Sequence, residues 1–414
     1  MTTPAKASSG GAVLVGALVI DSVGTGLFLP LSLIYFVRLT DVGLGLLGVL
    51  ISIAGAVAFP MPIWAGALAD RFGAFPVVVA AQLMQALGYL AYAWVGEPVG
   101  IFLATCLVTI GMRFFWSTVF TAVVDFADGS ASGMSKDSWL AVANTARNGG
   151  LALGGLITGA VVAGGEVTAY RAIAYCVAGC FGLAAAAIAL FVRAPRRPVS
   201  DADEPGAGYR TLLRDRPFLM LIGINTAFAM TSMMLALGLP TLVLIGLHGP
   251  AWLASAVLVG NTVLITVLAT PVVKRLAPYR RTRVIMAAAA LWAGWSFLFA
   301  VLLPGEHIWV IPVLIAATVL FTVAEVMHAP VSMALVAVIA PISVRGRYLA
   351  TFQYSFALAQ VIAPAYFTTL FEIHRALPWV GLGLINCLSI LAMLGWERRV
   401  PASARPAETV GERR

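Results

Sequence analysis

Five ionisable side chains interrupt long apolar stretches of the sequence, where a charge needs a reason to be kept. A charged group at the middle of a lipid bilayer costs on the order of 3 kcal/mol by insertion scales. Ionisable residues in such stretches mark ion pathways, proton relays or substrate sites when the stretches cross a membrane. The informative residues are Asp21, Arg113, Asp125, Arg147 and Glu325.

Asp21 and Arg113 are the two residue types that a switchable ion pair requires. Asp21 lies about ten residues into its apolar stretch, which places it near mid-depth at a helical rise of about 1.5 Å per residue. Arg113 lies midway along another stretch. A carboxylate that gains and loses a proton beside a permanent cation could exchange partners. A fixed structural ion pair is the alternative.

Glu325 is the only acidic residue inside an apolar stretch of the second half of the chain. Apolar surroundings disfavour the ionised form of a carboxyl group, as a carrier that loads protons near neutral pH requires. We interpret Glu325 as a proton or cation site, and the alternative is a protonated side chain that bonds a neighbouring backbone group. His328 shares its helix face, but one Glu-x-x-His unit is only half of a di-metal site. We expect a packing or hydrogen-bonding histidine, and no metal or other cofactor.

Two clusters of large apolar side chains are candidates for substrate contact. One lies beside Arg113, and the other recurs at helical spacing in the stretch 217–246. Aromatic and methionine surfaces adapt to varied apolar ligands. The alternative is that these side chains face lipid or neighbouring helices. The six residues are Phe114, Trp116, Phe120, Met230, Met233 and Met234.

The composition of the chain indicates the kind of structure that holds these residues in place. The chain is 61% hydrophobic and 11% charged, whereas a soluble domain carries about 25% charged residues. The alternating pattern of barrel strands is absent, so the apolar stretches predict membrane-spanning helices. We predict an all-α integral membrane protein with twelve such helices, near 12–37, 42–69, 75–95, 100–126, 139–163, 170–193, 217–246, 251–276, 283–303, 308–340, 347–371 and 378–396.

The distribution of cations predicts the orientation. With both termini cytoplasmic, Arg38, Arg171 and Arg375 lie outside, and Arg113 and Arg147 lie within spans, which leaves 21 of the 26 Lys and Arg inside. This imbalance follows the positive-inside rule. The net charge of +8 is therefore a topology signal and does not indicate a nucleic-acid partner. We expect a multi-pass protein of the inner (plasma) membrane.

A polar, proline-containing segment divides the chain into two halves. We predict an N-terminal six-helix bundle, a cytoplasmic linker, a second six-helix bundle and a cytoplasmic tail, at 1–192, 193–216, 217–396 and 397–414. With a shift of 213 residues, 107–111 (LVTIG) aligns with 320–324 (LFTVA), and with a shift of 210 Leu29-Pro30 aligns with Leu239-Pro240. Similar offsets indicate an internal repeat of parallel orientation, typical of transporters that bind substrate at the midplane between halves.

The segment Gly66-Ala67-Leu68-Ala69-Asp70-Arg71-Phe72-Gly73 resembles the signature between helices two and three of the major facilitator superfamily. Asp21 with the following Ser22-Val23-Gly24-Thr25-Gly26, Arg113, and Gly149-Gly150 with Gly154-Gly155 are similar to helices one, four and five of its twelve-helix drug/proton antiporters. The resemblance implies two pseudo-symmetric bundles, with helices one and four lining a central cavity. It also implies proton-coupling roles for Asp21, Arg113 and Glu325.

The resemblance implies a gate at the loop after helix two. Asp70 would meet the positive end of a helix dipole there, in a loop shaped by Gly66, Arg71 and Gly73. Ordinary solvation of the loop is the alternative. The basic residues that usually follow the second glycine are replaced by Ala74-Phe75. We expect Asp125 and Arg147, near the cytoplasmic ends of helices four and five, to pair in their place as a structural or gating contact.

Together these features predict a secondary active transporter, working as a monomer, that exports lipophilic or cationic drug-like compounds by proton-coupled alternating access. No Gly-x4-Gly-Lys-Ser/Thr loop is present for ATP, and no catalytic constellation indicates an enzyme. The expected partners are a small-molecule substrate, protons and the lipid bilayer. Proton-coupled uptake of a nutrient is the runner-up, and a non-transporting receptor or a channel is the alternative of a different class.

Overall fold

The computed structural model describes residues 5–130, 136–162, 166–192, 212, 214–276, 278–302, 307–340 and 345–399, and the regular structure within them is helical. This confirms the all-α prediction. The chain forms two compact units, Met1–Asp201 with Pro250–Val259, and Ala202–Gly249 with Gly260–Arg414. We call them unit 1 and unit 2. Most of the predicted linker and tail lies outside the described residues, so their proposed boundaries stay a prediction.

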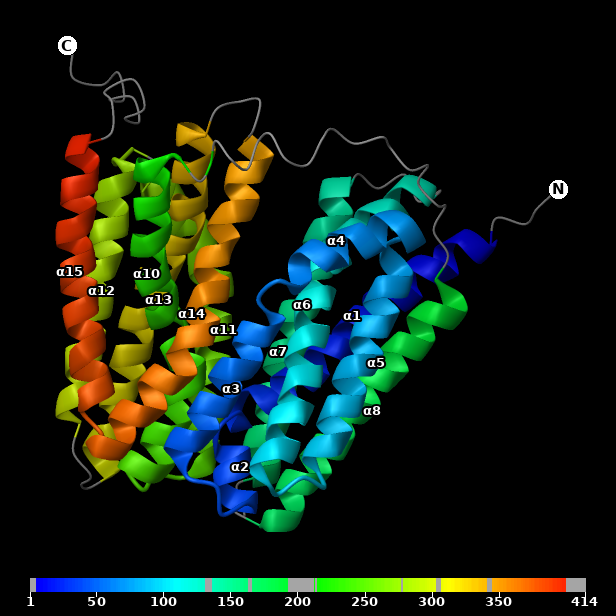
Figure 1. Ribbon diagram of the computed structural model, residues 1–414, viewed down its shortest axis with the longest axis horizontal. Coiled ribbons are helices and arrows are strands. Elements are labelled where there is room, and N and C mark those ends of the chain that lie inside the picture. Colours follow the sequence, from blue (N-terminus) through cyan, green and yellow to red (C-terminus); the bar gives the residue numbers. More distant parts are fainter. Residues whose placement is uncertain are drawn as a thin grey trace. The chain divides into compact units, whose positions relative to one another are not determined.

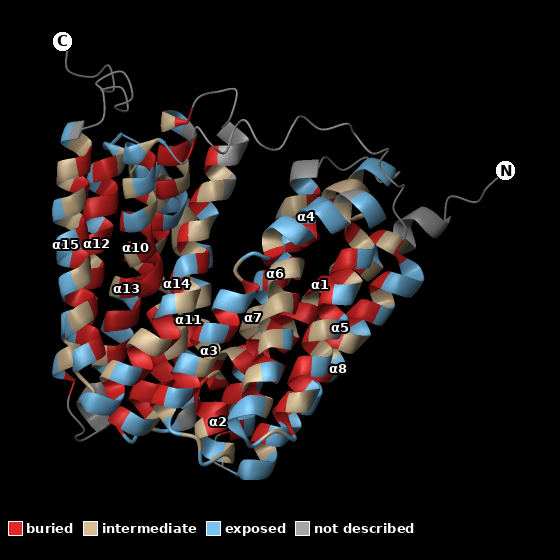
Figure 2. Ribbon diagram, in the orientation of Figure 1, coloured by how far each residue is buried: buried red, intermediate tan, exposed pale blue. Residues whose placement is uncertain are grey.

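The described part of residues 1–201 in unit 1 contains eight α-helices and one short 3-10 turn. The elements are α1 (Ala5–Phe28), η1 (Leu29–Leu31), α2 (Ile34–Leu39), α3 (Leu44–Ala58), α4 (Met61–Phe72), α5 (Ala74–Tyr92), α6 (Pro98–Gly129), α7 (Lys136–Val161) and α8 (Val167–Phe191). Within this unit α1 packs against α7 and α8, and α5 packs against α6 and α8. Figure 2 shows buried residues along much of α1, which is therefore a central element of the unit.

Unit 2 repeats the helical plan with longer elements. They are α10 (Arg216–Thr241), the π-helical turn η3 (Leu242–Gly246), α11 (Ala251–Leu276), α12 (Arg281–Val301), α13 (His307–Ile339), α14 (Arg345–Ile373) and α15 (Leu377–Arg399); the first residues of α11 belong to unit 1. In Figure 1, α10, α12 and α15 run side by side, and α12 also packs on α13. Its aromatic core contains three fully buried tryptophans, Trp292, Trp295 and Trp379.

Ten described helices are long and apolar enough to span a bilayer, and one bent pair would make an eleventh. The pair is α3 and α4, which meet at an angle of 40° where one span over 42–69 was expected. Pro60 and Pro62 explain the bend, since proline lacks the N–H that a continuous helix uses. The remaining expected span is α7. It is less apolar than the other spans because polar and glycine residues make up much of its sequence.

The α1–α7 seam is built on small residues. A Cβ added at Gly150 would meet the carbonyl oxygen of Val19 at 2.6 Å, and one at Gly154 would meet the backbone of Val23. Thr158 continues the seam and donates a hydrogen bond to the Leu27 carbonyl oxygen (2.6 Å). Small residues four positions apart let two membrane helices approach closely. The glycine-rich segment therefore fixes the register of α7 against α1.

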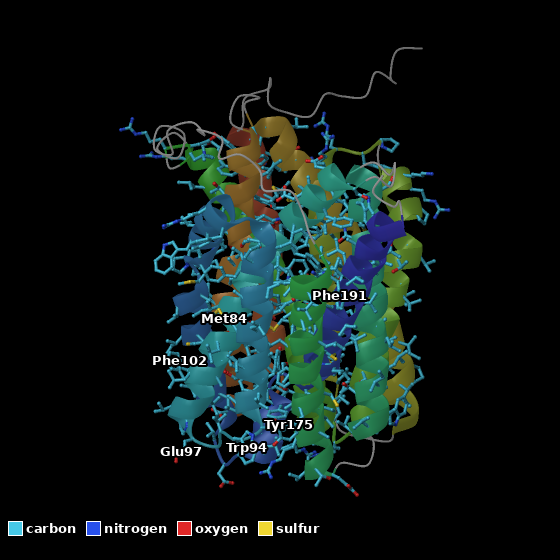
Figure 3. All side chains as sticks on the ribbon, turned by 90° about the vertical axis from the view of Figure 1, so that its right-hand side faces the viewer. Met84, Trp94, Glu97, Phe102, Tyr175 and Phe191 are labelled. Atoms are coloured by element: carbon cyan, nitrogen blue, oxygen red, sulfur yellow. The ribbon has the colours of Figure 1, made fainter. Side chains whose placement is uncertain are left out.

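One end of unit 1 carries aromatic and acidic side chains typical of a membrane interface. Trp94, Glu97 and Tyr175 lie at this end in Figure 3, and Phe191 lies nearer the other end. Trp94 is 78% exposed in the connection between α5 and α6. Trp and Tyr gather where the hydrocarbon meets the headgroups, because their rings are apolar and their N–H or O–H groups are polar. This end therefore resembles the edge of a membrane span.

Candidate functional site

Asp21 lies in the interior of unit 1 and is 1% exposed. Gln82 of α5 donates a hydrogen bond from Nε2 to Asp21 Oδ1 (3.2 Å). Tyr89 of α5 and Cys180 of α8 also lie within electrostatic range of the carboxyl group. The acid of α1 is thus enclosed by side chains of the helices that pack on it. Its hydrogen bond comes from a neutral donor.

Arg147 of α7 is the cation that interacts electrostatically with Asp21. Its guanidinium carbon lies 4.1 Å from the ring centroid of Trp116 and 5.0 Å from that of Phe115. The side chain is 8% exposed, and within the described residues its Nη1 atom has no hydrogen-bond partner. Arg147 therefore stands between one carboxyl group and two aromatic faces of α6.

The register of α7 explains this position. Residues at helical spacings of three and four share a face, and Arg147 precedes Gly150 by three on the face that packs on α1. The glycines bring the α7 backbone against α1. The guanidinium of the arginine at the end of the same stripe lies over the α6 rings and interacts electrostatically with Asp21. Gly26 closes the contact from the α1 side, where an added Cβ would meet the carbonyl of Leu151.

Sequence alone suggested Asp21 with Arg113 and Asp125 with Arg147, and both pairings stay predictions. The structure adds an electrostatic interaction between Asp21 and Arg147. Arg113 and Asp125 are both half-buried on α6. Their roles in coupling and gating stay predictions. Gln82 was missed because an amide in an apolar stretch carries no charge to mark it.

Glu325 of α13 is the centre of a hydrogen-bond network in unit 2. Ser232 of α10 donates to Oε1 and Asn261 of α11 donates to Oε2, each at 3.3 Å. Thr322 donates to Oδ1 of Asn261 (2.6 Å) and so orients the amide. Two neighbouring helices, α10 and α11, therefore present neutral polar groups to the carboxyl group of α13. Asn261 could have been recognised from the sequence as an amide inside an apolar span.

His328 lies one turn beyond Glu325 and packs among aromatic rings. Its ring centroid is 5.2 Å from that of Phe228 and 5.1 Å from that of Trp292. The side chain is 2% exposed. These contacts agree with the expected packing role. No group of three potential metal ligands occurs among the described residues.

The six predicted substrate residues lie in different environments. In unit 1 Trp116 is 50% exposed, whereas Phe114 and Phe120 are half-buried. In unit 2 Met234 is fully buried, Met230 packs against Ala229 and Ala359, and Met233 is half-buried. Substrate contact stays a prediction for all six. Trp116 is the member whose ring both contacts Arg147 and reaches the surface of its unit.

The turn between α4 and α5 is made by a glycine with a positive φ. Gly73 has φ +92°, a backbone conformation that side-chain-bearing residues rarely adopt, and its N–H bonds to the Ala69 carbonyl oxygen (2.8 Å). Arg71 lies over the Phe72 ring at 5.2 Å, and Gly66 is exposed. The side chain of Asp70 lies outside the described residues. The second glycine of the signature is therefore required by the turn itself.

Comparisons with known proteins agree with this architecture. A family model described as Major Facilitator Superfamily matches residues 14–364. The chain is 26% identical over 370 residues to "Multidrug resistance protein MdtH" of Photorhabdus laumondii subsp. laumondii, with 88% of each chain covered, and 26% identical over 380 residues to the protein of that name from Klebsiella pneumoniae, with 89% of each covered.

Solved structures show the same fold. The crystal structure of the nucleoside transporter NupG, in a mutant form, matches with a TM-score of 0.79 at 13% identity and covers 94% of this chain and 99% of that one. A POT family transporter in complex with a thioalcohol-conjugated peptide matches with a TM-score of 0.73 at 14% identity, covering 94% and 96%. At these identities the likeness concerns the fold.

Proposed function

The chain belongs to the major facilitator superfamily, and from two acids within its helices, Asp21 and Glu325, we propose that it exports lipophilic or cationic drug-like compounds in exchange for protons. As a member of this family it is a multi-pass membrane transporter of small molecules and not an enzyme. Proton coupling, export, alternating access, the inner-membrane location with cytoplasmic termini, and function as a monomer are the proposed refinements.

The observation that carries the proposal is that a helix of each unit, within the described residues, holds a carboxyl group bonded by neutral donors, the buried Asp21 and the half-buried Glu325. Asp21 accepts from Gln82, and Glu325 accepts from Ser232 and Asn261. Donors of this kind hold the ionised form without a fixed ion pair at the same atoms, so a proton can be added without stranding a bonded cation. A carboxyl group inside a membrane span is by default a functional site.

The proposed drug-like substrate has two supports. The relatives that align over most of the chain carry the name multidrug resistance protein. In unit 1 the half-exposed Trp116 offers an aromatic face, and such faces bind flat apolar compounds and lipophilic cations. Resistance to antibiotics would follow if such compounds are exported from the cell.

The gating proposal concerns the α4 loop and the cytoplasmic end of α6. Asp70, Arg71, Gly66 and Gly73 would form the gate, with Gly73 setting the turn through its positive φ. Asp125 would contribute from α6. A Gly73 variant that keeps binding but loses turnover would support this assignment, whereas unchanged turnover would contradict it.

Transport by purified protein in proteoliposomes tests the whole proposal. A pH gradient should drive tetraphenylphosphonium uphill, and its reversal should reverse the flux. Glu325→Gln should lose uphill transport and keep downhill exchange, since an amide cannot carry the proton. Uphill flux that ignores the pH gradient would overturn the proposal. Gradient-driven uptake of sugars or amino acids alone would favour the nutrient importer, and flux that is only ever downhill would favour a channel.

A further inference from the structure

Arg147 occupies an aromatic face that a substrate could use. Its guanidinium carbon lies 4.1 Å from the centroid of Trp116, on a side chain that is half-exposed. The same guanidinium lies over Phe115, which is 3% exposed and fixed in the core of unit 1. Planar guanidinium groups stack on aromatic rings, and this attraction is strongest where water is excluded.

The other attraction on Arg147 is the charge of Asp21. Nη1 is buried without a hydrogen-bond partner among the described residues, so no bonded anchor is seen to hold that nitrogen in place. The guanidinium is therefore subject to two competing attractions, one toward the Asp21 carboxylate and one toward the rings of α6. Adding a proton to Asp21 removes the first attraction and leaves the second unchanged.

We propose that Arg147 is an internal competitor for the aromatic site at Trp116, held there when Asp21 is protonated and drawn away when Asp21 is ionised. The inference rests on the proposed proton coupling and gives it a mechanism. Protonation closes the Trp116 face to lipophilic aromatic compounds, whether neutral or cationic, and deprotonation opens it. Proton and substrate then exclude one another without sharing atoms, as exchange requires.

Other titratable and charged groups near this pair are few in the described part of unit 1. Tyr89 of α5 and Cys180 of α8 interact with Asp21, and both residue types ordinarily stay protonated below about pH 7.5. On α6, Arg113 and Asp125 lie three residues before and nine after Trp116. Asp125 is a second carboxylic acid, so a variant that changes Asp21 alone is needed to assign the pH dependence of binding to Asp21.

A neutral probe separates this proposal from simple competition for negative charge. Binding of tetraphenylphosphonium weakens at low pH under either model, because protonated Asp21 attracts no cation. Binding of neutral triphenylphosphine oxide changes only if the aromatic face itself is blocked. We expect its affinity for wild-type protein to fall about thirtyfold from about pH 7.5 to about pH 5.5, the factor that corresponds to a buried cation–π contact. Asp21→Asn should bind it weakly at both pH values.

Arg147→Gln should bind the neutral probe tightly at both pH values, since no guanidinium competes. If Arg147→Gln folds poorly, Arg147→Lys provides a second test. Lysine keeps the charge and loses the planar stacking, so the affinity of this variant for the neutral probe should change less with pH than that of wild type. Arg171→Gln on the exposed face of α8 is the matched arginine control. The proposal is overturned if the affinity for the neutral probe is independent of pH in wild type. It is also overturned if this affinity depends on pH in Arg147→Gln.

The ligand-free protein provides an independent test. The emission of Trp116 is obtained by subtracting the fluorescence spectrum of Trp116→Phe from that of wild type. Trp94→Phe is the control for the loss of an exposed indole. This difference spectrum should change between about pH 7.5 and about pH 5.5, keep its low-pH form in Asp21→Asn, and be constant in Arg147→Gln. A constant spectrum in wild type refutes the device. Absence of pH-driven flux in proteoliposomes would instead refute the proposed function, so the two failures are distinguishable.

Discussion

Arg147→Ala should destabilise the protein by about 3 to 5 kcal/mol, and adding Asp21→Asn should restore part of the loss. Two contributions set the magnitude. The guanidinium loses its contacts with Phe115 and Trp116 at 5.0 and 4.1 Å, about 2 kcal/mol in a dry site. Asp21, 1% exposed, keeps a buried charge whose cation is gone, and stranding a buried charge costs about 3 to 5 kcal/mol. The two contributions overlap, so their sum is an upper bound.

The double variant isolates the electrostatic share. Asparagine at position 21 removes the stranded charge and can still accept the hydrogen bond from Gln82 Nε2. About 0.5 to 3 kcal/mol should therefore return, the range found for residues that interact directly. Asp125→Asn in the Arg147→Ala background should return less, because Asp21 is the acid in electrostatic contact with Arg147. A pairing of Arg147 with Asp125, which sequence alone suggested, predicts instead that Asp125→Asn restores more stability than Asp21→Asn.

Denaturant and thermal unfolding of the purified variants in one detergent would measure these differences. Arg171→Gln should stay within about 0.5 kcal/mol of wild type, as expected for an exposed substitution. Losses that add within about 0.5 kcal/mol in the Asp21–Arg147 double variant would show that the two side chains do not interact. The reasoning about both the site and its coupling would then fail.

Three further outcomes are expected. Asp21→Asn should remove most of the pH dependence of tetraphenylphosphonium affinity between about pH 5.5 and about pH 8.5; an unchanged profile in a stable variant would leave Glu325 as the proton carrier. Gly154→Leu should sharply lower the yield of folded protein, since any side chain there meets the α1 backbone. The control Gly149→Ala has open space around it and should match the wild-type yield. Equal yields of the two variants would contradict the close packing of α7 on α1. Gly73→Ala should lower stability by about 1 to 3 kcal/mol because of its φ of +92°, and calorimetry showing no loss would mean that the turn relaxes.

The sequence was sufficient for the helical fold and for the buried acids. Apolar length predicts a span without any knowledge of its neighbours, and an acid in such a span stands out by type. The bend between α3 and α4 was also readable, because Pro60 and Pro62 lie inside the expected span. These features are local, so periodicity and composition determine them.

The partners of the acids were not predictable in the same way. Gln82 is 61 residues from Asp21, and Asn261 is 64 residues from Glu325. Which faces meet across such separations depends on helix packing, and helical periodicity does not specify it. The electrostatic interaction of Arg147 with Asp21 follows from the glycine stripe of α7, which packs this helix against α1. The stripe was visible in the sequence, but the helix against which it packs was not.

The glycine seam between α1 and α7 also bears on how this transporter can evolve. A Cβ at Gly154 would meet only backbone atoms, and one at Gly150 would meet the Val19 carbonyl oxygen as well as Ser22 Cβ, so a compensating substitution on α1 cannot make room for a larger residue. Mutations that alter substrate range are therefore barred from the seam. They are left to the exposed face of α6, where Trp116 can change size without moving a helix. New specificities should arise there while the path between Asp21 and Arg147 is inherited unchanged.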